Sequence, residues 1–222
     1  MVEDLFETQP VGVIEHNLDE VSEDTVALIQ NEEIIATSPI SALNEMILLV
    51  NSDLFRTGAR TIKEIDLPAV IKELDEIPFH LRGYPESHKE KLLLIVISRY
   101  IERIAWIHQS GSIRSSFQNL SRLNDEKGTK QVYERLAGSD VDVHLYGKPD
   151  WIPPMDLCSA THIGNSPDFD VWFVVYTPPQ NGSIDEYAAL VAVEIGANEW
   201  EGFWTFQPSK VKEINAYIEH NM

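Results

Sequence analysis

The chain has 222 residues, of which 36 are acidic and 17 basic, so its formal net charge is -19 at pH 7. A chain of this length buries a sizeable core, and contents of 43% hydrophobic and 24% charged residues are ordinary for a globular protein. The strong negative charge argues against direct binding of nucleic acid and of anionic membrane surfaces, because their phosphate groups would be repelled.

The acidic residues are spread along the chain rather than collected in a tail. This spread is consistent with a solvated surface that keeps the protein soluble and monomeric. It is also consistent with adaptation to very high salt, where a screening length of about 3 Å at 1 M removes the self-repulsion. The even spread favours a halophilic protein. Because Cys158 is the single cysteine and no signal peptide or apolar run of about 20 residues is visible, we expect a reduced, cytoplasmic protein without a membrane span.

The first third of the chain predicts a hairpin followed by two helices. Thr25–Gln30 and Ile34–Thr37 are short apolar runs separated by two polar residues, which is typical of paired strands. Ser38-Pro39 then resembles the start of a helix, which we expect over residues 40–50. A second, short amphipathic helix is expected over residues 67–75.

The stretch from Ser87 to Gln109 predicts the central helix. Ser87 and Glu90 form a capping box at its start, and Gly111 follows its end. Residues 92–97 are apolar on all sides, which is typical of a helix buried on most of its surface. Such a helix is either a scaffold or a helix that pairs with its twin in a homodimer.

Residues 78–86, just before this helix, contain two prolines and a glycine and predict a turn-rich link. We place a domain boundary there. Residues 1–79 form an N-terminal α/β segment, and residues 80–222 form the second domain.

After the central helix the pattern predicts two further helices and then a change of period. Ile113, Phe117 and Leu120 fall at helical spacing, so we expect a helix over residues 112–123, and another over residues 129–137. A half-buried strand follows, in which apolar residues at 141, 143 and 145 alternate with Asp142, His144 and Tyr146.

The last third predicts several strands and one closing helix. The expected strands cover residues 157–163, 171–176, 187–195 and 200–206, and the helix covers residues 208–218. Helices followed by strands indicate an α+β fold. We expect a mainly antiparallel central sheet of about five strands, packed against the long buried helix and shorter helices.

The residue types that carry common chemistries do not assemble into a recognisable motif. No pair among the seven histidines has metal-ligand spacing, and the phosphate-binding and nucleophile-elbow motifs are absent. Cys158 and His162 would stand about 13 Å apart on a strand, which is too far for a nucleophile and its base. We therefore expect no enzymatic activity, no metal site and no catalytic residues, and the sequence names no cofactor.

The residues that suggest a ligand site are aromatic and charged. Tryptophans 172, 200 and 204 lie on predicted strands, which is typical of core packing but also of an aromatic-lined pocket between sheet and helices. The polar stripe of the central helix would line such a pocket if it faces the sheet, but it is equally compatible with a solvated face or an intrahelical ion pair. The candidate ligand-binding residues are therefore Arg99, Glu102, Arg103, Trp172, Trp200 and Trp204.

Several segments resemble the DICT sensory domain, a family associated with diguanylate cyclases and two-component systems. These are SRYIERIAW, FQNLSRL, VYERLA with the following VDVHLYG, FDVWFVVYTPP, AALVAVEI and WEGFWTFQPSKV. With the segment that precedes them, the match covers roughly Leu81 to the C-terminus. The leading LRGYPESHKEKLLL is similar to that of the longer single-chain versions from haloarchaea, in agreement with the acidity.

The resemblance implies a cytoplasmic signal-input module, linked to light responses through its association with blue-light sensors. It carries no catalytic residues over to this chain. Because no output segment is recognisable, we expect a separate signalling protein to produce the output. The input would be a light-linked signal or a small-molecule ligand that this chain binds. Two other functions stay open: an enzyme of unrecognised type with a carboxylate-lined cleft, and a purely structural interaction protein.

Overall fold

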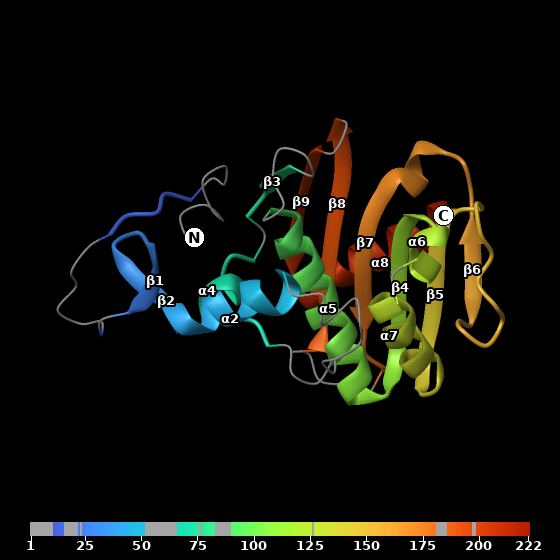
Figure 1. Cartoon of the computed structure of the whole chain (residues 1–222), viewed down its shortest axis with the longest axis horizontal. Helices are drawn as coiled ribbons and strands as arrows, with labels where there is room; N and C mark the ends of the chain where they lie inside the picture. The colour runs from blue at the N-terminus through green and yellow to red at the C-terminus, as the bar shows by residue number, and fades with distance from the viewer. Residues whose placement is uncertain are drawn as a thin grey trace.

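A computed structural model describes residues 11–15, 22, 24–51, 66–75, 77–82, 90–125, 127–180, 186–196 and 199–222 of the chain (Figure 1). Among the helices so described, none combines the length and the apolar character needed to cross a membrane.

The described part of the chain is organised around one large sheet of seven strands in the order β3-β9-β8-β7-β4-β5-β6. In chain order these strands are β3 (Phe79–Arg82), β4 (Ser110–Asn119), β5 (Asp140–Lys148), β6 (Ala160–Ile163), β7 (Val171–Thr177), β8 (Ala188–Gly196) and β9 (Glu199–Thr205). Two more strands, β1 (Thr25–Gln30) and β2 (Glu33–Pro39), form a separate antiparallel hairpin.

The large sheet is mixed. β4, β5 and β6 run parallel to one another, whereas β4, β7, β8, β9 and β3 pair antiparallel in succession. The α+β class predicted from the sequence is confirmed, but the sheet has seven strands rather than about five, and it is mixed, with four antiparallel and two parallel pairings. Parallel pairs need a crossover, and α7 (Lys127–Ala137) supplies the one between β4 and β5.

Helices cover both faces of the sheet (Figure 1). α5 (Glu90–His108) and α7 pack on one face, with the short α6 (Ser121–Asp125) beside α7. α8 (Pro208–Asn221) packs on the other face, against β7 and β8. On the far side of α5 lie α2 (Ile40–Asn51) and the single turn α4 (Ala69–Lys72), and a 3-10 turn, η2 (Pro167–Asp170), precedes β7.

The two faces of the sheet enclose two apolar cores. The larger lies under α5 and α7 and includes Leu94, Ile97 and Ile101, each of which is fully buried. The smaller lies under α8, where Val211 and Ile218 meet Phe173 and its neighbours. Burial of this apolar area is the main source of stability, at about 25 cal/mol per Å².

The stretch predicted as a helix over residues 112–123 is instead strand β4 followed by α6. The prediction was wrong because residues four apart, such as Ile113 and Phe117, lie on one face of a helix and also on one face of a strand. Ile113, Ser115 and Phe117 alternate inward with period two, and the polar residues between them face α8. Gln118, with a φ of 61°, interrupts the strand before α6 begins.

The turn-rich link expected over residues 78–86 contains strand β3, which pairs with β9 at the sheet edge. Leu43 and Val70 belong to the same core cluster as the residues of α5. The predicted boundary between residues 79 and 80 stays a prediction. Ser87, the predicted N-cap of the central helix, lies outside the described residues.

Gly111, the second residue of β4, has a φ of 90°, and a Cβ atom there would lie 2.5 Å from the Thr177 carbonyl oxygen. That neighbour is backbone and has little room to move. We expect Gly111→Ala to lower the free energy of unfolding by about 1–3 kcal/mol, because it adds strain and a clash. Chemical denaturation measures the change. Gly12→Ala is the control, since no atom lies within 4 Å of a Cβ there; equal effects of the two substitutions would contradict this account.

Candidate functional site

A buried polar network joins α5, α7 and β4 inside the larger core. The Arg99 guanidinium pairs with the Glu102 carboxylate at 2.5 Å and donates a second hydrogen bond to the Thr129 hydroxyl. The Tyr133 hydroxyl oxygen lies 3.0 Å from Glu102 Oε1 and 2.6 Å from the Ser115 hydroxyl oxygen. We call these five residues the interior network.

The local sequence explains how these groups meet. Arg99 and Glu102 are three residues apart on α5, and Thr129 and Tyr133 are four apart on α7, so each pair shares one helix face. Ser115 lies between two apolar residues that point into the same core from β4. The interior network therefore links helices α5 and α7 to strand β4 of the sheet.

The interior network is almost fully shielded from solvent, since the side chains of Arg99 and Glu102 are 8% and 2% exposed. Burial and the adjacent Glu102 carboxylate raise the pKa of Tyr133 well above its ordinary value. The phenol thus keeps its proton. Because it has a single proton and the carboxylate is the stronger acceptor, Tyr133 donates to Glu102 and accepts from Ser115.

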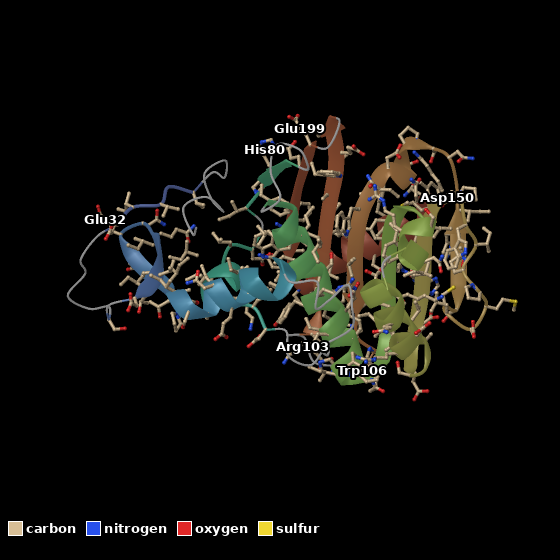
Figure 2. All side chains as sticks on the ribbon, viewed as in Figure 1. Glu32, His80, Arg103, Trp106, Asp150 and Glu199 are labelled. Carbon is tan, nitrogen blue, oxygen red and sulfur yellow. The ribbon has the colours of Figure 1, made fainter. Side chains whose placement is uncertain are left out.

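The other sequence-predicted residues lie apart from this centre. Arg103 is half-buried and lies beside Trp106 toward the end of α5 (Figure 2). Trp172 on β7 pairs across strands with Phe117, whose ring centroid lies 5.3 Å from that of Tyr133.

Trp200 and Trp204 lie on β9 and are 3% and 2% exposed. The ring of Trp204 packs 5.2 Å from that of Phe79 on edge strand β3. The structure thus brings Arg99 and Glu102 together, but it leaves these two tryptophans in the core toward the opposite edge of the sheet.

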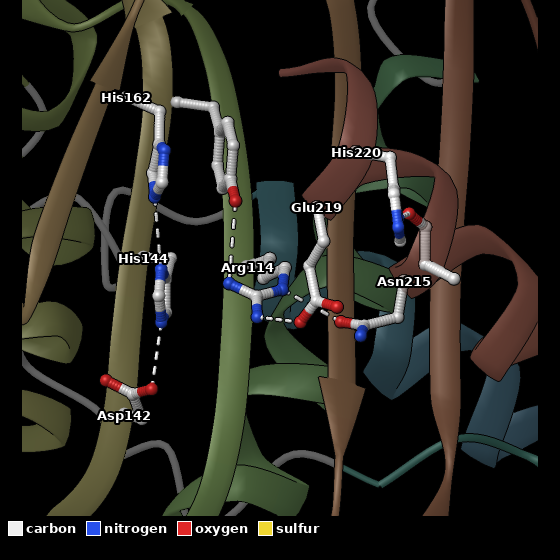
Figure 3. Close-up of polar contacts among 9 residues, drawn as sticks. Arg114, Asp142, His144, His162, Asn215, Glu219 and His220 are labelled. Carbon is white, nitrogen blue, oxygen red and sulfur yellow. Dashed lines mark hydrogen bonds and ion pairs between the residues drawn. The ribbon is translucent and has the colours of Figure 1, made fainter.

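A second polar cluster lies on the opposite face of the sheet, beside α8 (Figure 3). Arg114 projects from β4, and its side chain is 9% exposed. Its guanidinium donates to Asn215 Oδ1 at 2.8 Å, to the Tyr146 hydroxyl at 3.5 Å, and to the carboxylate of Glu219. Arg114 thereby ties α8 to the sheet.

Next to Arg114 three side chains form a hydrogen-bonded chain across β5 and β6 (Figure 3). Asp142 Oδ2 lies 2.8 Å from His144 Nε2, and His144 Nδ1 lies 3.1 Å from His162 Nε2. The His162 ring stacks on the Tyr146 ring with centroids 4.2 Å apart and an interplanar angle of 6°. The chain ends in the half-exposed carboxylate of Asp142.

The carboxylates of this second cluster are held in the ionised form. Burial alone would raise the pKa of Asp142, but hydrogen bonds from Ser159 and His144 hold it below its ordinary value. Burial likewise opposes ionisation of Glu219, and the hydrogen bond from Arg114 lowers its pKa. A pKa shifted downward suits charge pairing rather than proton donation near neutral pH. Within the described residues, no three His, Cys, Asp or Glu side chains converge as ligands of a metal ion do.

Sequence reasoning missed most of the second cluster. Alternation along β5 placed Asp142, His144 and Tyr146 on one face, and this was the available signal. Arg114 was hidden by the incorrect helix prediction. His162 and Glu219 reach the cluster through strand pairing and helix docking that no local pattern encodes. Comparison with known proteins finds no matching family model, no matching curated protein and no matching solved structure.

Proposed function

We propose that the protein is a non-enzymatic signal-transduction module that senses a small ligand or a light-linked signal and acts through a separate partner protein. The resemblance to the DICT sensory domain supports this role. The α+β sheet with its helical layers is compatible with it.

The observation that carries the proposal is the interior network. A buried ion pair contributes little net stability, because removing both charges from water costs about as much as their attraction returns. Apolar residues of similar volume would stabilise the same site equally well. Charges retained at the junction of two helices and a strand therefore favour a role in selecting between arrangements of α5 and α7.

The proposed mechanism is a population shift. A signal that binds one arrangement of α5 and α7 more tightly than the other moves the equilibrium by the difference in binding free energy. Breaking and remaking the hydrogen bonds of Glu102 and Tyr133 would separate the two arrangements. The partner would then recognise the surface that the favoured arrangement presents.

The test deletes the gene for this protein in its natural host and reintroduces it on a plasmid. The readout is the set of transcripts that change when the host is exposed to light or to a change of medium. We expect the wild-type gene to restore that response. The double variant Arg99→Met/Glu102→Leu should accumulate to the same level but fail to restore it, because its core is apolar and fixed. A matched control is Ile107→Ala, which changes an exposed residue of the same helix. Full restoration by the double variant would overturn the proposed role of the network, and a deletion that alters only a metabolite pool would favour an enzyme.

A further inference from the structure

We propose that the contact between His144 and His162 is a proton-sensitive closure of edge strand β6, so that the protein responds to pH through this second cluster. This inference goes beyond the proposed function, because it uses the opposite face of the sheet and none of the residues of the interior network.

The two histidine rings share a limited number of protons at physiological pH. His144 Nε2 faces the ionised Asp142 at 2.8 Å and carries a proton to donate. Between His144 Nδ1 and His162 Nε2, at 3.1 Å, there is room for one proton. In the neutral pair His162 Nε2 donates that proton to His144 Nδ1, and His162 Nδ1 is left with a lone pair.

The pair accepts one further proton without breaking the contact. That proton enters at His162 Nδ1, and the positive charge is shared with His144 by shifting the proton between the rings. Asp142 at the other end of the chain balances the charge.

A second additional proton cannot be accommodated in this geometry. Both facing nitrogens would then be donors, and two hydrogens would lie about 1 Å apart across the 3.1 Å gap. The rings must separate.

The charged groups around the two rings also oppose further protonation of the pair. Arg114 on β4 is the fixed cation beside the rings, and burial together with His144 and Arg114 lowers the pKa of His162. The other titratable groups that face the pair are Asp142 and Tyr146 on β5 and Glu219 on α8; the two carboxylates remain ionised, and burial raises the pKa of Tyr146. A lowered histidine pKa stabilises the closed form above about pH 6.5, and this contribution is lost as the pH falls through the folded-state pKa.

Because His162 lies on the short edge strand β6, separation of the His144 and His162 rings would move this strand away from β5. β6 has four residues, lies at the end of the sheet, and pairs with β5 alone among the strands that the structure describes. His162 lies opposite Tyr146 in that pairing and stacks on its ring. Loss of the contact with His144 removes one of the side-chain contacts that hold this short edge strand to β5.

The first test uses the unmodified protein and follows the histidine ring signals by NMR through a pH titration. We expect His144 and His162 to report the same two separate protonation steps, because each proton is shared. His80, which lies on the opposite edge strand and pairs with Glu201, serves as the reference ring. Independent single steps at His144 and His162 would overturn the proposal.

The second test measures amide hydrogen exchange in β6, corrected for intrinsic rates, from about pH 8 to about pH 5. We expect protection of the β6 amides to fall by up to about tenfold for each pH unit below about pH 6.5, the ordinary pKa of a separated ring, until the second step is complete, while the amides of β7 stay protected. His162→Gln, which has no titratable ring, should remove the pH dependence, whereas the matched edge-strand variant His80→Gln should retain it. Protection that does not change with pH in the wild type, or a fall that persists in His162→Gln, contradicts the inference. Because the variant Arg99→Met/Glu102→Leu should behave as wild type here, failure of this inference is separable from failure of the proposed function.

Discussion

Arg99→Met alone is expected to lower the free energy of unfolding by about 3–5 kcal/mol, because it leaves the buried carboxylate of Glu102 without its cation. The Glu102 side chain is 2% exposed, so water does not replace the lost partner. Denaturant titration followed by circular dichroism measures the change. A loss of this size is a large part of the 5–15 kcal/mol that stabilises an ordinary domain.

The matched control for Arg99→Met is the double variant Arg99→Met/Glu102→Leu, which removes both charges and keeps the volume apolar. We expect its stability to lie within about 1 kcal/mol of the wild type or above it. The Tyr133 hydroxyl keeps its contact with Ser115 in that variant. If the single variant were as stable as the wild type, or the double variant less stable than the single, the ion pair would not have the energetics described here.

Ile97→Asp is expected to abolish folding. Ile97 is fully buried in the middle of α5, within the larger core. The substitution loses the packing of a large aliphatic side chain, about 2–5 kcal/mol, and adds the cost of burying an unpaired carboxylate. The sum exceeds the stability of a typical domain. Circular dichroism and size-exclusion chromatography measure the outcome.

The control for Ile97→Asp is Ile107→Asp on the same helix, where the isoleucine is 51% exposed. We expect a change in the free energy of unfolding of less than about 0.5 kcal/mol there. A folded Ile97→Asp protein that changes only its oligomeric state would instead place this face of α5 in a dimer interface, the alternative that the sequence left open.

The elements that the sequence predicted well are those with a single dominant pattern. The apolar runs within residues 171–177 and 188–196 are strands β7 and β8, and α5 lies inside the predicted stretch Ser87–Gln109. These segments are long, strongly apolar and bounded by proline or glycine. The order of all seven strands in the sheet was not predictable, because it depends on contacts between distant parts of the chain.

Prediction from the sequence failed where the helical period of about 3.6 residues and the strand period of two residues both fit the spacing of the apolar residues. Ile113 and Phe117 are compatible with a helix and with a strand, and only the pairing with β5 and β7 decides between them. Two of the five residues of the interior network, Arg99 and Glu102, were singled out from the sequence, since they lie on one polar stripe. Thr129, Tyr133 and Ser115 were not, because an isolated tyrosine, threonine or serine in an amphipathic segment carries no sign of a buried partner.

The measurement that tests the central claim most directly is native-state amide hydrogen exchange of α5 and α7 in the wild type and in Arg99→Met/Glu102→Leu. If the interior network separates two arrangements, wild-type amides of these helices exchange through a shared opening that costs less than global unfolding. In the double variant the same amides should exchange only by global unfolding. Exchange by global unfolding in both proteins would contradict the claim and leave the interior network a purely structural feature.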